Sequence, residues 1–127
     1  MHRFIFILML LSSFSLSCEN NLTQAEEFIR VMNLFEEMRE MAVSEHCSIP
    51  DEWEIIPFGS KSCGGPFGYL AYHNSIDTTA FFELVEEHRK AQEAYHLRWG
   101  IVSDCILIPE PIGLRCVDGE PQLIFPD

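Results

Sequence analysis

The sequence predicts an α+β fold in which a small antiparallel sheet packs against one or two helices and disulfides staple the domain. Three observations lead to this prediction. Two stretches repeat apolar residues at helical spacing, several short apolar runs are bounded by glycine or proline, and the 127-residue chain has five cysteines. The sequence contains no internal repeat and no low-complexity linker, so residues 18–127 are expected to form a single small domain.

Residues 1–17 have the organisation of a signal peptide. His2 and Arg3 give a short, weakly basic start, residues 4–11 are all apolar, and small residues follow over 12–17. An apolar run of roughly 8–14 residues is shorter than the about 20 that a membrane-spanning helix needs. The sequence therefore predicts export of the chain.

Cys18 directly follows this segment. Leu16 and Ser17 before it resemble a relaxed lipobox, so we expect a lipid on Cys18 that tethers the domain to a membrane face. Cleavage by an ordinary signal peptidase after small residues is the alternative, and the product would then be secreted. Lipid attachment also accounts for the odd number of cysteines, because it leaves an even set of four: Cys47, Cys63, Cys105 and Cys116.

Export favours oxidation of these four thiols into two disulfides. Each would contribute about 2–4 kcal/mol by restricting the unfolded chain, which matters for a domain of roughly 110 residues with a modest core. Four cysteines allow three pairings, and spacing alone leaves all three open.

The first helix is expected over about residues 23–45. Thr23 and Glu26 form a capping box at its start. Apolar residues then recur at helical spacing: Phe28, Val31, Met32, Phe35, Met38 and Ala42. Core packing is the preferred interpretation of this methionine-rich stripe, and a partner-binding face is the alternative.

The second helix has clear signals at both ends. Asp77 is a good N-cap, Ile76 can pack against Phe81 as a hydrophobic staple, and Gly100 is placed to end the helix. One stripe runs along it: Phe81, Leu84, Val85, His88, Gln92, Tyr95 and Trp99.

His88 lies on this apolar stripe, and we interpret it as a partly buried, hydrogen-bonded packing residue. The glutamates of the same helix are interpreted as a solvated acidic face. A metal site made of Glu83, Glu87 and His88 is disfavoured, because the histidine is rotated away from the two glutamates. The sequence implies no metal and no cofactor.

Short strands are expected before and after the second helix. Two precede it, a single strand follows Gly100, and a hairpin turns at Asp118-Gly119 near the end of the chain. The expected strands cover residues 53–58, 69–72, 101–108, 114–117 and 122–125.

The segment 57–69 carries four glycines and two prolines and must turn tightly. It lacks the spacing of a phosphate-binding loop, so nucleotide binding is disfavoured. Two interpretations remain. The segment is a structural turn that brings Cys63 to its disulfide partner, or it is a rigid loop that offers Phe58, Lys61 and Phe67 to a partner or small ligand.

The acidic composition excludes some partners. The net charge of −12 repels phosphate backbones, so we expect no nucleic-acid binding. Anionic lipid headgroups are disfavoured for the same reason, which leaves the N-terminal lipid as the expected membrane contact. Catalytic signatures are also missing, since His46-Cys47 is a neighbouring pair in sequence and not a dyad, and no Cys-x-x-Cys, zinc-ligand or Gly-x-Ser-x-Gly pattern occurs. We therefore expect no enzyme activity and no catalytic residue.

Several blocks together resemble an uncharacterised family of small secreted or lipid-anchored bacterial proteins. The blocks are Trp53, Ile56-Pro57-Phe58-Gly59-Ser60-Lys61, Cys63-Gly64-Gly65-Pro66, Tyr69-Leu70 with Tyr72, and Val102-Ser103-Asp104-Cys105. The resemblance covers roughly residues 47–116 and implies location and fold without assigning catalytic residues. It also favours pairing of Cys63 with Cys105, and hence of Cys47 with Cys116. Family members typically have a further cysteine after the last turn, where this chain has Glu120-Pro121-Gln122.

Two functions are consistent with these observations. The preferred one is a non-catalytic module of the bacterial cell envelope, lipid-anchored or secreted, that gives structural support or binds an unknown protein or small-molecule partner. The alternative is an inhibitor of an exported hydrolase, in which the loop held by Cys63 occupies the active-site cleft of the enzyme.

Overall fold

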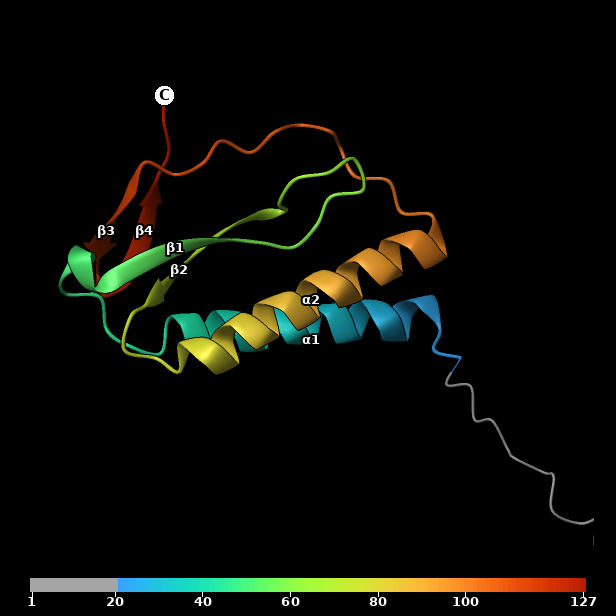
Figure 1. Ribbon diagram of the computed structural model, residues 1–127, viewed down its shortest axis with the longest axis horizontal. Helices are drawn as coiled ribbons and strands as arrows, with labels where there is room; N and C mark the ends of the chain where they lie inside the picture. Colours follow the sequence, from blue (N-terminus) through green and yellow to red (C-terminus); the bar gives the residue numbers. More distant parts are fainter. Residues whose placement is uncertain (1–20) are drawn as a thin grey trace, which may run out of the picture.

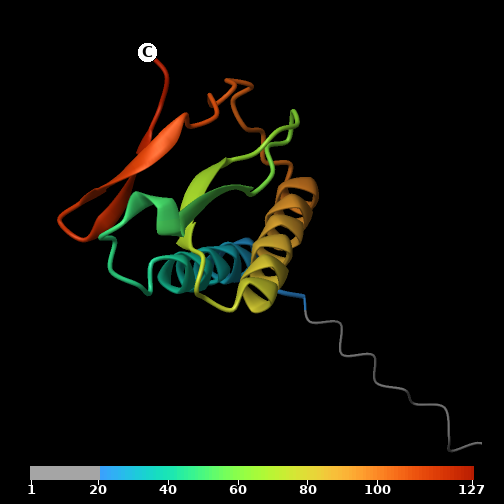
Figure 2. The same ribbon diagram turned by 60° about the vertical axis from the view of Figure 1, so that its left-hand side comes forward.

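The computed structural model describes residues 21–127 and has the predicted α+β architecture. Two antiparallel helices lie side by side, a first hairpin crosses over them, and a second hairpin lies beyond one end of the pair (Figures 1 and 2). The elements in chain order are α1 (Gln24–Ala42), the 3₁₀ helix η1 (Pro50–Glu52), β1 (Trp53–Phe58), β2 (Gly68–His73), α2 (Thr78–Trp99), β3 (Gly113–Val117) and β4 (Glu120–Ile124).

The predicted signal peptide, residues 1–17, and Cys18 lie outside the described residues. Between residues 21 and 127 no helix combines the length and the apolar composition that crossing a membrane requires.

Both helices begin and end where local signals place them. The Glu26 amide donates to Thr23 Oγ1 at 3.3 Å, and the Thr23 amide donates to Glu26 Oε2 at 2.8 Å, which confirms the capping box of α1. At α2, Asp77 Oδ1 accepts from the Ala80 amide at 3.0 Å. Gly100 ends α2 in the left-handed region, with φ of 61°.

The main core lies between the helices and the first sheet. Met38 and Ala42 of α1 and Phe81 of α2 are completely buried there. The hairpin β1–β2 covers them, with its strands paired from Trp53 opposite His73 to Phe58 opposite Gly68. The predicted inward stripe of α2 is confirmed by the burial of Phe81, His88 and Gln92.

The sheet that we predicted as one unit is divided in two. β3 and β4 form a separate two-stranded sheet, whose hairpin turns at Asp118 (φ 52°) and Gly119 (φ 84°), as Asp-Gly predicts for a type I′ turn. A disulfide between Cys47 and Cys116 joins this hairpin to the segment that follows α1. The two bonded cysteines are 69 residues apart, so the bond stabilises the fold by about 4 kcal/mol on the loop-entropy estimate.

The strand predicted over residues 101–108 is wrong. This segment has no regular secondary structure, and Val102, Ile106 and Leu107 are largely exposed. An apolar run becomes a strand only where a second strand supplies the hydrogen-bonding partners. Here the carbonyl groups of Ile101 and Ile106 accept from side chains of the β1–β2 loop instead of from a strand.

Candidate binding site

A largely apolar cavity of about 310 Å³ lies where the N-terminal half of α1 meets the C-terminal half of α2. Phe67 of the loop between β1 and β2 (residues 59–67, the β1–β2 loop) also lines it. Figure 1 shows this loop above the C-terminal half of α2. We call this space the central cavity. Aromatic rings from all of these elements form most of its wall: Phe28, Phe35, Phe58, Phe67 and Tyr95.

The apolar stripe of α1 divides between core and cavity. Its C-terminal part, Met38 and Ala42, is fully buried, which confirms core packing there. Its N-terminal part lines the cavity, and Phe28 and Met32 remain 49% and 39% exposed. Core packing is therefore confirmed for the C-terminal half of the stripe, while a partner-binding role of its N-terminal half stays a prediction.

Polar contacts hold the helices together at the cavity end. Trp99 Nε1 of α2 donates to Glu27 Oε2 of α1 at 2.6 Å, and Arg98 forms an ion pair with the same carboxylate. The rings of Phe28 and Tyr95 pack with their centroids 6.0 Å apart. These contacts join α1 to α2 at the end of the helix pair where the cavity lies.

His88 lies on the wall of the cavity and is 2% exposed. Its ring packs between Phe35 and Phe58, with centroid separations of 5.9 and 6.1 Å. Its Nδ1 is buried and has no hydrogen-bond partner among residues 21–127, so the expectation of a hydrogen-bonded histidine is wrong at this nitrogen. Burial lowers the pKa of His88 below its usual 6.5, because the charged imidazolium loses its solvation.

Gln92 connects α2 to the β1–β2 loop. Its Oε1 accepts from the Ser60 amide at 2.7 Å, and its side chain is nearly buried. The preceding residue, Gly59, has φ of 71°, and a Cβ there would lie only 2.6 Å from Gln92 Oε1 and 2.7 Å from Phe67 Cβ. Glycine is therefore required for the loop to approach the helix this closely.

Lys61 does not point outward to a partner. Its side chain is 8% exposed, and Nζ donates to Asp104 Oδ1 at 2.8 Å and to the Ile106 carbonyl at 2.7 Å. The Lys61 ammonium in turn holds the pKa of Asp104 below its usual 3.8. This corrects the expectation that Lys61 is offered to a partner, because its charge is already bound within the protein.

The other two residues of the candidate binding loop face the cavity. Phe58 is half-buried against Phe35 and His88, and Phe67 is 47% exposed at the mouth. Lys61 is therefore not free to contact a hydrolase, whereas Phe67 is exposed, and the inhibitor alternative stays a prediction.

Cys63 and Cys105 are both exposed and are not bonded to each other in the structure. The two thiols are neighbours, since a hydrogen bond from Cys105 lowers the pKa of Cys63 and raises that of Cys105. The Cys63 thiol also donates to the Asp104 carbonyl at 3.4 Å. The predicted disulfide between Cys47 and Cys116 is confirmed. The predicted partners Cys63 and Cys105 are neighbours in the structure, but both are free thiols.

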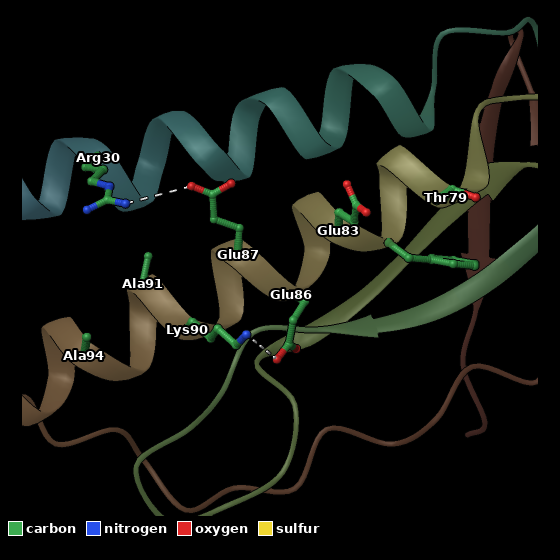
Figure 3. A pocket seen from close by; sticks show the side chains of 9 residues that line it. Arg30, Thr79, Glu83, Glu86, Glu87, Lys90, Ala91 and Ala94 are labelled. Atoms are coloured by element: carbon green, nitrogen blue, oxygen red, sulfur yellow. Dashed lines mark ion pairs between the residues drawn. The ribbon is translucent and has the colours of Figure 1, made fainter.

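A second hollow, a groove of about 860 Å³, runs along the outer face of the helices (Figure 3). Four of its charged side chains form exposed ion pairs: Arg30 lies 3.8 Å from Glu87, and Lys90 lies 3.6 Å from Glu86. Such exposed pairs contribute little to stability or binding. The groove is larger than the central cavity and has apolar surface from Phe82, Ala91 and Ala94, but a ligand there would also cover exposed charged side chains.

The glutamates of α2 and His88 face different hollows. Glu83 and Glu87 line the groove, whereas His88 lines the central cavity. Within residues 21–127 no three His, Cys, Asp or Glu side chains are placed to hold a metal ion together.

Comparison with family models, with curated proteins and with solved structures found no match for this chain. The residues of the central cavity are therefore identified from the structure alone. Sequence reasoning placed His88, Gln92 and Tyr95 on one stripe but did not identify a cavity. One feature of the sequence could have indicated the cavity: two polar side chains, His88 and Gln92, lie on a helix stripe that is otherwise typical of a hydrophobic core.

Proposed function

We propose that this protein is a non-catalytic, exported module of the bacterial cell envelope that binds a small apolar molecule in the central cavity. The cavity itself is the observation that supports this proposal most directly. Its volume of about 310 Å³ falls at the lower end of the roughly 300–1,000 Å³ range of small-molecule sites, and its wall is mainly aromatic.

The exposed rings at the cavity mouth favour binding over a purely structural role. Phe28, Met32 and Phe67 form an apolar rim that faces water. Covering apolar surface contributes about 25 cal/mol per Å², so a molecule seated between these side chains gains affinity from each of them. The fixed helices and the bound loop keep the entropy cost of ordering the site small.

The composition of the wall supports a binding role over a catalytic one. Among the described residues that line the cavity there is no carboxylate and no thiol, and His88 is packed between two phenyl rings. The histidines that line the cavity, His88 and His96, therefore have no carboxylate or thiol beside them there to form a catalytic pair.

The tether that we propose at Cys18 fits the position of the cavity. Cys18 precedes the N-cap Thr23 by five residues, and the cavity lies beside the N-terminal half of α1. A lipid on Cys18 would therefore place this end of the domain nearest the membrane. Metabolic labelling with a fatty-acid analogue, with Cys18→Ser as the unlabelled control, tests the tether independently of ligand binding.

Binding is tested with the neutral fluorescent probe N-phenyl-1-naphthylamine on the exported Cys18→Ser protein. Met32→Glu places a charge at the cavity rim and should weaken probe binding by at least about tenfold. Ile29→Glu is the matched control, because Ile29 is exposed on the same helix but does not line the cavity. The proposal is overturned if wild-type protein does not bind the probe, or if both variants weaken binding equally at unchanged Tm.

A further inference from the structure

We propose that one end of the domain docks on the surface of the membrane that holds the Cys18 lipid, through the apolar side chains of Leu97 and Val102. We call this end, residues 22–30, 59–67 and 89–104, the tethered end. The inference rests on the lipid that we propose at Cys18 and goes beyond it, because it gives the folded domain a second membrane contact and a fixed orientation. Its basis is the short chain between Cys18 and the fold, together with the apolar surface and the charges of the tethered end.

Only a short length of chain separates Cys18 from the tethered end. Leu22 already contacts the fold, because its carbonyl accepts a hydrogen bond from Arg98 Nη2 of α2 at 3.4 Å (Figure 1). Four residues of chain span at most about 14 Å, so a lipid on Cys18 keeps the C-terminal end of α2 close to the membrane surface. Such a tether gives this end a high effective concentration at the membrane, and a contact that is too weak to bind by itself can then form.

The tethered end carries highly exposed apolar side chains. Leu97, in the last turn of α2, is 80% exposed, and Val102, just after the helix, is 86% exposed. Both line one hollow of about 280 Å³ beside the β1–β2 loop, so they lie on the same part of the surface. His96 and Ile101 line this hollow and the central cavity alike, so the half-exposed Phe67 at the cavity mouth continues the apolar surface. Apolar side chains gathered at a tethered end are suited to the boundary between lipid headgroups and acyl chains.

The charge of the domain is unevenly distributed. The net charge of −12 predicts repulsion between the chain as a whole and anionic headgroups, but the tethered end does not share this charge. The tethered end contains four carboxylates and five cations, whereas the rest of residues 21–127 contains fifteen carboxylates and two cations. The acidic part of the domain therefore favours the orientation in which the tethered end faces the membrane.

Most charged groups of the tethered end already have a partner of opposite charge. Three of its four carboxylates form ion pairs: Glu27 with Arg98, Asp104 with Lys61, and Glu93 with Arg89. An ion pair loses less solvation energy near an apolar phase than the same two charges apart. Pairing therefore lowers the cost of bringing this end against a zwitterionic bilayer.

The test uses the lipid-anchored, nitrogen-15-labelled protein in small phosphatidylcholine bicelles that contain a lipid with a gadolinium-chelating headgroup. Gadolinium broadens the amide resonances that stay near the membrane surface, and bicelles with diamagnetic lutetium give the reference intensities. The amides of residues 95–104 should lose most of their intensity, whereas those of residues 113–124 in the second hairpin should keep most of theirs. A tether without docking would broaden only the residues next to it, at the start of α1.

Two exposed side chains are changed together to test the contact. Leu97→Gln with Val102→Gln should abolish the preferential broadening of residues 95–104. The Tm should change little, because both side chains are exposed and glutamine has nearly the helix propensity of leucine. Ile112→Gln is the matched control, since Ile112 is 71% exposed but pairs with Ile124 beside the second hairpin. It should leave the pattern unchanged.

The outcomes separate docking from the tether. Equal broadening of residues 95–104 and 113–124, or an unchanged pattern in the double variant, would overturn the docking while leaving the tether intact. The same loss of pattern in Ile112→Gln would also overturn the assignment of Leu97 and Val102. Absence of a lipid on Cys18 in the metabolic labelling experiment would overturn the tether and this inference together, and neither result bears on binding of the probe in the central cavity.

Discussion

Lys61 Nζ of the β1–β2 loop lies 2.8 Å from Asp104 Oδ1, and the two partners differ sharply in exposure. The lysine side chain is 8% exposed, whereas that of the aspartate is 66% exposed. The contact joins segments 43 residues apart and anchors the β1–β2 loop, whose Phe67 lines the central cavity. Because only one partner is buried, the two residues should respond differently to substitution.

Asp104→Asn is expected to lower Tm more than Lys61→Met. Removing the carboxylate charge leaves a buried ammonium without its counter-ion, whereas removing the ammonium leaves a carboxylate that water can solvate. Thermal unfolding of both variants checks the order, with Glu110→Gln as a control at another exposed carboxylate. A larger loss for Lys61→Met would contradict the asymmetry.

The ion pair between Lys61 and Asp104 also makes the stability of the β1–β2 loop depend on pH. The pKa of Asp104 in the folded protein lies below its usual 3.8, so the stabilisation is fully present above that value and is lost as pH falls through the lower folded pKa. Amide chemical shifts of residues 59–67 should therefore move in acid in wild-type protein. In Asp104→Asn they should already resemble the acidic form at pH 6.

Cys63 and Cys105 are expected to form a disulfide when the protein is treated with oxidised glutathione. The Cys63 thiolate attacks the glutathione disulfide and releases one glutathione thiol, and Cys105 then displaces the second as its own proton is lost. Because the pKa of Cys63 is lowered and that of Cys105 is raised, Cys63 should also react first with iodoacetamide.

Mass spectrometry of non-reduced peptides checks this prediction. The oxidised protein should lose two hydrogens and yield a peptide pair that contains Cys63 and Cys105. Cys47 and Cys116 provide the internal control, since they are already bonded and Cys47 is buried. Two thiols that still react with iodoacetamide after oxidation, or faster alkylation of Cys105, would contradict it.

The parts of the fold that were predictable depend on interactions between close neighbours in sequence. Thr23 with Glu26, Asp77 with Ala80, and the Asp118-Gly119 turn each specify backbone geometry within four residues. These contacts are the same in any tertiary environment, so composition and spacing were sufficient to place the helices and hairpins.

The parts that were not predictable depend on distant partners. Residues 101–108 have strand-like composition, but their carbonyl groups are taken by Lys61 and Ser62. The burial of Lys61 depends on Asp104, far away in sequence. The central cavity arises because the apolar stripe of α1 is covered by the first sheet at one end only, a difference that periodicity does not encode.

His88 provides the last prediction, which concerns the dependence of stability on pH. Its pKa lies below 6.5 in the folded protein because Phe35 of α1 and Phe58 of β1 enclose the ring. The unfolded chain therefore takes up the proton first, and the free energy of unfolding should decrease as pH falls below about 6.5, until the folded pKa is reached.

Urea denaturation of wild-type protein and His88→Phe at pH 7.5, 6.5 and 5.5 measures this effect. The variant should be at least as stable as wild type at pH 7.5, because it removes an unsatisfied nitrogen, and its advantage should grow as pH falls. His88→Gln should share the weaker pH dependence, whatever its stability. A constant difference between wild type and variant would mean that the folded protein protonates His88 as readily as the unfolded chain does.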